Sequence, residues 1–409
     1  MALFRDLPHE ILLEIFSLLG WIDLASTSRV SRRLRTVSEP LLYRAPSLYI
    51  TDEEQLPQNI HMFLRTLLTP GREVLATHVR SLTLEWDYLE DTLGPETALF
   101  AAAASRLGIA QPIVSAGAQA VLLLHLLPRL QVLDVDPPET LDAFSIFMDA
   151  QHEVQHTQKL PLGLQSLREY FCCWTSGVSP RTLLTVLKLP CIRTIIVQFS
   201  DEVDFPSAMA GLDITSTVTN LRLLNSVVST SSLAYILKIS RALEQFTFCV
   251  RGFDLLSFGN ALEPLRNTLQ SLTLDFQCVC SRNYRITDEI STYPIGSLRE
   301  WPVLYTLRCS MVALLGMGPR GGLPRLLEHV LPAGIRELEI LSDQYWPPEE
   351  VVDHVVLLLE RKEAVAAKLQ KVVVLTDWRG NTEHQKLKDA CEAVKVELVD
   401  GYSFAFTYY

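Results

Sequence analysis

Two histidines and a glutamate stand at a spacing that could hold a catalytic zinc ion. His152, Glu153 and His156 satisfy the pattern H-E-x-x-H. On a helix this spacing puts both imidazoles on one face and the carboxylate beside a metal-bound water. The flanks are polar, the glycine and third histidine of the extended motif do not follow, and Leu160-Pro161 ends any helix. We therefore interpret the segment as a solvated helix end in a loop, and keep a zinc hydrolase as the least favoured of three hypotheses.

Three glycines satisfy the pattern of a dinucleotide-binding loop. Gly316, Gly318 and Gly321 follow a predicted strand at Leu304–Cys309. In a dinucleotide site the loop comes directly after the strand, so that its backbone N–H groups face phosphate. Here Met311–Leu315 separates the strand from the glycines. The pattern is therefore interpreted as a connecting loop.

Cysteine usage favours a reducing compartment. Cys278 and Cys280 form a C-x-C pair, and no second pair lies at zinc-site spacing. Most of the eight cysteines lie in apolar stretches, which suits small core residues. The start of the chain has Asp6 and Glu10 and does not resemble a secretory signal peptide. We predict no metal, no cofactor and no catalytic residue, and a location in the cytoplasm, the nucleus or both.

The chain is longer than one globular core. A single core stops growing at about 250–300 residues, and this chain has 409, of which 48% are hydrophobic. The apolar content excludes intrinsic disorder, and the net charge of −11 argues against nucleic-acid binding. Residues 1–50 carry a net +1, so the acidic charge belongs to the remainder. Several domains or one repeat array remain possible at this point.

An internal repeat in the sequence favours one repeat array over several separate domains. The pattern apolar-x-x-apolar-x-apolar recurs, and four consecutive spacings between its central residues fall within 25–28 residues. Alternating apolar residues indicate strands, and segments such as Ser232–Leu243 and Glu350–Leu369 between them have helical spacing. A strand and helix repeated at this interval bury their apolar faces by stacking. The central residues of the pattern are 82, 133, 167, 195, 221, 246, 272, 307, 338 and 372.

This array resembles leucine-rich repeat proteins, with degenerate repeats, from about Leu75 to Asp400. The resemblance implies an α/β fold, an irregular solenoid with a curved parallel sheet and outer helices. We predict the solenoid over residues 75–409, with an insertion near 88–129 and linker helices at 49–74. The uncharged stretch Leu107–Leu127 is long enough to span a bilayer, but Pro112 splits it. Two buried helical pieces are predicted there, and no membrane contact.

The first fifty residues predict three short helices. Ile11, Ile15 and Leu18 form one apolar stripe, and Leu12 and Phe16 widen it beyond half of the helix circumference, which suggests a second burial surface. Pro8 suits the first turn of helix one, and Gly20 ends it. Asp23 is expected to cap helix two, over 24–30, and Ser31 to cap helix three, over 32–43.

These helices resemble an F-box, over residues 1–48. The matching features include Leu7-Pro8, Glu10-Ile11-Leu12, Asp23-Leu24 and the basic pair Arg32-Arg33. F-box segments bind the adaptor subunit of SCF-type cullin–RING ubiquitin ligases, and through it a cullin. Apolar anchors of this kind suit docking of helices into a groove. The resemblance places these residues toward the adaptor: Leu7, Pro8, Ile11, Leu12, Ile15, Phe16, Leu19, Leu24, Val30 and Leu34.

Polar residues between the inward leucines line the predicted sheet face, the usual binding surface of a repeat array. Their mixed charges suit a protein substrate, and the acidic balance favours basic partners. The candidates for substrate contact are Glu85, Asp134, Arg168, Arg222, Asp275, Arg308 and Glu339.

The sequence therefore predicts a non-catalytic substrate-recognition subunit of an SCF ubiquitin ligase. The alternative is a leucine-rich repeat scaffold whose N-terminal helices only cap the array.

Overall fold

A computed structural model describes most of the chain. The described residues are 7–50, 60–86, 97–109, 116–136, 161–172, 180–198, 215–226, 228–250, 255–275, 294–316, 326–341, 346–375 and 381–401. They divide into two compact units, Met1–Ile195 and Ile196–Tyr409, and each unit is described by itself.

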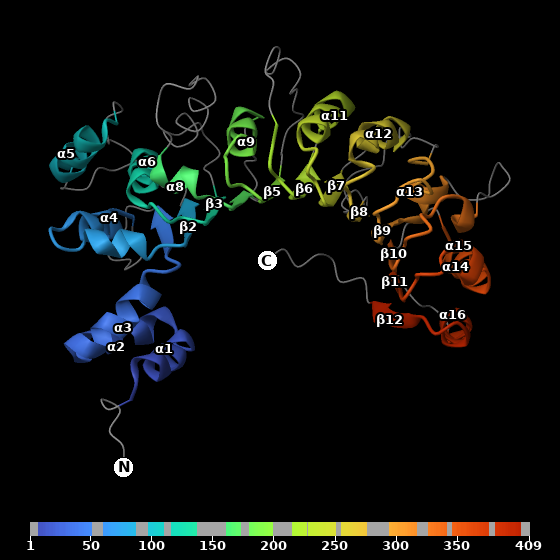
Figure 1. Ribbon diagram of the computed structural model, residues 1–409, viewed down its shortest axis with the longest axis horizontal. Coiled ribbons are helices and arrows are strands. Elements are labelled where there is room, and N and C mark those ends of the chain that lie inside the picture. The colour runs from blue at the N-terminus through green and yellow to red at the C-terminus, as the bar shows by residue number, and fades with distance from the viewer. Residues whose placement is uncertain are drawn as a thin grey trace. The chain divides into compact units, whose positions relative to one another are not determined.

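The first unit holds the N-terminal helices and the first strands (Figure 1). Its strands β1 to β4 are parallel neighbours in chain order. Its helices are α1 (His9–Ser17), α2 (Trp21–Val30), α3 (Arg32–Leu42), α4 (Ile60–Leu68), η2 (Glu73–Thr77), α5 (Thr97–Leu107), α6 (Ala116–Leu126), α8 (Leu162–Gln165) and α9 (Pro180–Leu187). Its strands are β1 (Ser47–Ile50), β2 (Ser81–Trp86), β3 (Val132–Asp136) and β4 (Glu169–Cys172), and β5 (Thr194–Gln198) contains the boundary.

The second unit continues the alternation of strands and helices, and α11 and α12 lie on the same side of strands β6 to β8 (Figure 1). Its strands are β6 (Asn220–Ser226), β7 (Gln245–Val250), β8 (Ser271–Asp275), β9 (Thr306–Ser310), β10 (Glu337–Leu341), β11 (Lys371–Leu375) and β12 (Glu397–Gly401). Its helices are α11 (Thr230–Ile239), α12 (Leu255–Leu262), η3 (Glu263–Leu265), α13 (Met311–Leu315), η5 (Leu327–His329), α14 (Pro348–Glu360), α15 (Lys362–Val365) and α16 (Asn381–Ala393).

The strands follow one another in chain order as a twelve-stranded parallel sheet. N-terminal helices followed by such a sheet with helices confirm the predicted solenoid-like α/β class. The sheet begins earlier than predicted, because β1 spans the boundary between the predicted F-box and the predicted linker helices and pairs with β2. β12 also extends the ten predicted strands at the other end, pairing with β11.

The alternation of side chains explains why the strands align. The inward residue Leu82 stands beside Leu133, and Leu272 stands beside Leu307, all fully buried. Side chains alternate between the two faces of a strand, so a shift by one residue would expose each inward row. The apolar pattern therefore fixes the register wherever it is regular.

A recurrent backbone contact joins successive strands. The carbonyl of Arg80 accepts hydrogen bonds from the N–H groups of both Gln131 and Val132, at 2.7 and 3.0 Å. The carbonyl of Glu244 accepts two in the same way, from Gln270 and Ser271 at 2.7 and 3.0 Å. These bonds satisfy polar groups just ahead of each strand, where otherwise unpaired backbone would be costly.

The described part of the uncharged stretch contains one buried helix, α6. α6 is buried along most of its length, whereas Leu107 ends α5 and is 38% exposed. Residues 110–115, between the two helices, lie outside the described residues. In the part of the chain that is described, no helix is both long and apolar enough to cross a membrane.

Candidate functional site

The N-terminal module consists of α1, α2 and α3. Pro8 is the N-cap of α1, one position ahead of the predicted first turn. Asp23 lies within the first turn of α2 and does not cap it, because the helix begins at Trp21 after Gly20. Ser31 caps α3 as predicted, since its hydroxyl accepts a hydrogen bond from the Leu34 N–H at 3.2 Å.

The core of the module is small and comes from all three helices. Leu12 and Phe16 of α1, Leu24 of α2 and Val37 of α3 are at most 6% exposed. Further residues pack against them while staying partly exposed: Leu7, Ile15, Leu19, Leu34, Leu41 and Leu42. Leu12 and Phe16 are four residues apart and share one face of α1, so this face of the helix is used for folding.

A second apolar stripe on α1 is exposed. Ile11 is 41% exposed and Leu18, at the end of the helix, is 86% exposed. Ile15 lies between them and is half-buried, so the three residues follow the spacing i, i+4, i+7 of one helix face. Ile15 packs against the core, whereas Ile11 and Leu18 remain exposed, as the wide apolar stripe in the sequence suggested.

The sequence analysis missed apolar residues of α2. Trp21 and Ile22 come directly after Gly20, at the start of α2, and are 46% and 61% exposed. Val30, which was predicted, is 72% exposed at the other end of α2. Exposed apolar residues that gather in one small module indicate an interaction surface. Apolar residues directly after a helix-ending glycine were the sequence feature that could have identified Trp21 and Ile22.

The ten residues predicted to face the adaptor occupy three environments. Leu12, Phe16 and Leu24 are core residues, so burial removes them from any contact surface of the folded module. Pro8, Ile11 and Val30 are exposed. Leu7, Ile15, Leu19 and Leu34 are half-buried against the core.

The module is fixed to the first strand–helix unit. An ion pair joins Arg72 to Glu39 of α3 at 2.7 Å. The rings of Tyr43 and Phe63 stack with centroids 5.9 Å apart. Burial raises the pKa of the Tyr43 hydroxyl, while Arg72 opposes that effect. These contacts tie α3 to α4 and to the turn before η2.

The sheet face of the first unit is acidic. Glu85 accepts a hydrogen bond from the Ser47 hydroxyl at 3.0 Å. Burial, and then the nearby carboxylate of Glu85, raise the pKa of Asp134. Asp134 pairs in register with Thr83, so Asp134 and Glu85 come from adjacent strands. The two predicted residues are therefore brought together.

Arg168 does not belong to this row. Asp134 stands beside Phe171 in the register, and Leu133 stands beside Tyr170. Tyr170 and Cys172 are the inward residues of β4, at 2% and 1% exposure. The assignment was wrong because an aromatic residue takes the place of the inward leucine. Arg168 precedes the strand, which begins at Glu169.

The face of the second unit contains an ion pair between neighbouring strands. Arg308 of β9 and Glu339 of β10 stand side by side in register, with Nε and Oε1 3.3 Å apart. Burial raises the pKa of Glu339, and Arg308 partly offsets this. Arg222 is exposed on β6, whereas Asp275 at the end of β8 is only 1% exposed. Burial therefore keeps Asp275 from direct contact with a partner in this conformation.

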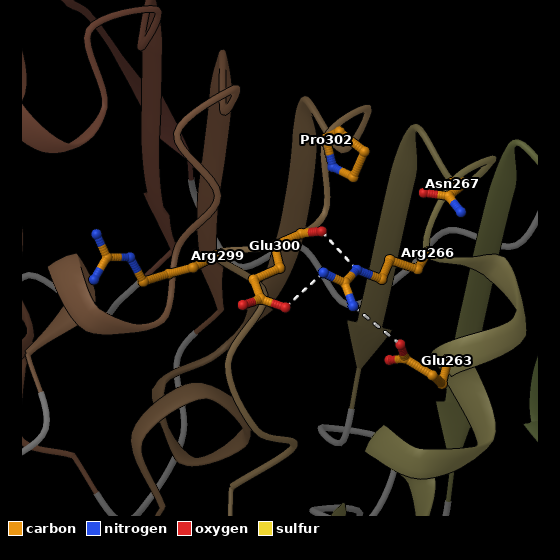
Figure 2. Close-up of a pocket in the computed structure, with 6 residues that line it drawn as sticks. All are labelled: Glu263, Arg266, Asn267, Arg299, Glu300 and Pro302. Carbon is orange, nitrogen blue, oxygen red and sulfur yellow. Dashed lines mark hydrogen bonds and ion pairs between the residues drawn. The ribbon is translucent and has the colours of Figure 1, made fainter.

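An open pocket of about 470 Å³ lies on the second unit, between the turn after η3 and the segment before β9. Figure 2 shows that the Arg266 guanidinium points at Glu300, while Arg299 points away from it. Arg266 donates to the Glu300 carbonyl at 2.7 Å and to its carboxylate at 2.5 Å, and it pairs with Glu263 at 3.3 Å. The guanidinium is thus occupied in joining two successive turns.

Most residues of the patterns considered for catalysis lie outside the part of the chain that the structure describes. His152, His156, Cys278, Cys280, Gly318 and Gly321 lie outside the described residues. Gly316 is described, and it ends α13 with a φ of 86°. Among the described residues no group of three histidine, cysteine or acidic side chains could hold a metal ion.

Comparison with known proteins addresses the N-terminal module. No curated protein matches this chain. The model of one protein family, described as F-box-like, matches residues 4–49. This segment spans α1, α2, α3 and most of β1, including both the buried core and the exposed apolar residues. The N-terminal module is therefore similar to the F-box-like family.

Proposed function

We propose that the chain is the substrate-recognition subunit of an SCF-type cullin–RING ubiquitin ligase. The observation that carries this proposal is the exposed apolar set Ile11, Leu18, Ile22 and Val30, here called the docking residues. It lies in a segment that is similar to the F-box-like family, and F-boxes bind the ligase adaptor.

The docking residues suit an apolar groove on that adaptor. Their side chains are exposed in the isolated chain, and burying apolar area gives about 25 cal/mol per Å². Binding then resembles the insertion of helical anchors into a hydrophobic groove. The core residues Leu12 and Phe16 support this surface by holding the shape of α1.

The sheet is proposed to carry substrate on the polar face of degenerate leucine-rich repeats. Glu85 and Asp134 form an acidic patch in the first unit, and Arg222, Arg308 and Glu339 lie on the face of the second. Such a face suits protein side chains of both signs. The chain then supplies binding, and the chemistry of ubiquitin transfer belongs to the other subunits.

The test is copurification of the adaptor with the full chain. We expect the wild-type chain to retain the adaptor in equal amount, and the double variant Ile11→Asp/Leu18→Asp to lose it while keeping its circular dichroism spectrum. The matched control is Leu107→Asp/Leu162→Asp, at residues with 38% and 41% exposure elsewhere in the same unit.

A folded docking variant that still binds the adaptor contradicts the proposal. If the wild-type chain retains no adaptor, the alternative of a scaffold capped by its N-terminal helices is supported. The ion pair between Arg72 and Glu39 is the contact that fits such a cap.

A further inference from the structure

Four arginines gather where α2 meets α3. Arg29 lies in the last turn of α2, and Arg32, Arg33 and Arg35 lie in the first turns of α3. All four are exposed. We call them the arginine cluster. In the sequence no acidic residue stands between Asp23 and Glu39.

Two residues of the cluster, Arg33 and Arg35, donate hydrogen bonds to backbone carbonyls. The Arg33 guanidinium donates to the Leu7 carbonyl, and Arg35 Nε donates to the Ser28 carbonyl at 3.1 Å. The guanidiniums of Arg29 and Arg32 make no hydrogen bond or ion pair with any described residue. Glu39, the acidic residue of α3, is paired with Arg72 instead.

The position of Arg32 and Arg33 does not serve the helix itself. The N-terminus of a helix carries partial positive charge, so cations in the first turn are unfavourable there. α3 has no acidic residue in its first turn. Arg29, by contrast, lies in the last turn of α2, where a cation is favourable. The charge of Arg32 therefore does not stabilise its own helix, which suits a role in binding.

The cluster adjoins the docking residues. Ile22, Ser26 and Arg29 are spaced i, i+4, i+7, so they lie on one face of α2. All three are exposed. Val30, with 72% exposure, stands between Arg29 and Arg32. Asp23 lies at the opposite end of α2, about 9 Å along the axis from Arg29.

We propose that Arg29 and Arg32 bind an acidic patch on the ligase adaptor, beside the groove that takes the docking residues. This inference rests on the proposed function and names the charge of the partner surface. The cationic cluster steers the adaptor into place from solution, and apolar contact then holds it. Residues 1–50 carry a net +1 and the remainder carries the acidic charge, so an acidic partner is attracted to this end of the chain.

The test is the rate of adaptor binding to the full chain, measured by surface plasmon resonance at several salt concentrations. For Arg29→Glu/Arg32→Glu we expect the association rate constant to fall on the order of tenfold at low salt. The difference should shrink at about 0.5 M salt, where charges are screened within a few ångströms. Arg29→Gln/Arg32→Gln should give an intermediate effect.

Matched controls separate this inference from the proposed function. Arg106→Glu/Arg129→Glu makes the same charge change at exposed residues of the same unit, and it should leave binding unchanged. Equal association rates and equal salt dependence for the wild type and the folded cluster variants overturn the inference while leaving the proposed function intact. Failure of the wild type to bind the adaptor at every salt concentration overturns the proposed function as well.

Discussion

Ile11 and Leu12 are consecutive residues of α1 with opposite environments. The Leu12 side chain is fully buried in the three-helix core, whereas Ile11 is 41% exposed. Successive residues of a helix differ by about 100° in direction, so one faces the core and the other faces solvent. Folding of the module and docking to a partner therefore depend on different apolar residues of the same helix.

The first prediction compares truncation at these two positions. Leu12→Ala should destabilise the module by about 2–5 kcal/mol, because it removes buried contacts and leaves a cavity. Ile11→Ala should change stability by about 0.5 kcal/mol or less, as surface substitutions usually do. Native-state hydrogen exchange of peptides from residues 9–42 measures both changes. Equal destabilisation by the two variants would place Ile11 in the core and contradict the structure.

The second prediction concerns Gly259 in α12. A Cβ atom there would lie 1.9 Å from the backbone oxygen of Ile295, a contact that only backbone movement can relieve. Alanine is otherwise preferred to glycine in a helix by about 1 kcal/mol. We expect the clash to win, so Gly259→Ala should destabilise by about 1–3 kcal/mol.

Thermal unfolding of the full chain checks the Gly259 variant. Gly334→Ala is the matched control, because its Cβ atom would meet its nearest neighbour, the Pro302 carbonyl oxygen, at an ordinary 3.5 Å. An unchanged or higher Tm for Gly259→Ala would show that the segment at Ile295 does not pack against α12 as described.

The third prediction is the pH dependence caused by Asp134. Burial and the Glu85 carboxylate raise its pKa in the folded state. The Asp134 carboxyl therefore binds its proton more tightly in the folded chain than in the unfolded chain. Protonation of Asp134 thus stabilises the fold, and this contribution is fully present below the unfolded pKa of about 3.9. It is lost as the pH rises through the folded pKa.

Asp134→Asn removes this dependence. We expect the variant to gain stability relative to the wild type at neutral pH and to lose that advantage near pH 4, as followed by Tm across the range. Glu85→Gln removes the Glu85 charge, which is the smaller cause of the raised Asp134 pKa. In that background the stability difference caused by Asp134→Asn should shrink only in part. A constant difference in Tm across the pH range would contradict the assignment.

The fourth prediction separates two cysteines by reactivity. Burial raises the pKa of the Cys391 thiol to about 11, and its side chain is 1% exposed. Cys191 is exposed. Since the thiolate is the reactive form, iodoacetamide at pH 8 should modify Cys191 on the order of a hundred times faster than Cys391.

Mass spectrometry of peptides from the native chain measures both rates. Unfolding in guanidinium chloride should make the two rates similar, which is the internal control. Rapid modification of Cys391 in the native chain would show that α16 opens far more readily than its burial indicates.

The sequence by itself determined the order of strands and helices and the presence of a separate helical module. Inward residues such as Leu82, Leu272 and Leu338 recur in the same apolar pattern, and alternation leaves one way to bury them. Ser31 was also identifiable as a cap, because capping depends on residues three positions apart.

Only the tertiary structure decided which apolar residues of the module form its core. A wide apolar stripe on α1 permits either Ile11 or Leu12 to face inward, and the packing of α2 and α3 selects Leu12. It also decided the register of β4, where Tyr170 occupies an inward position, and the burial of Asp275 at the end of β8. These outcomes depend on neighbours distant in the chain, which local spacing does not encode.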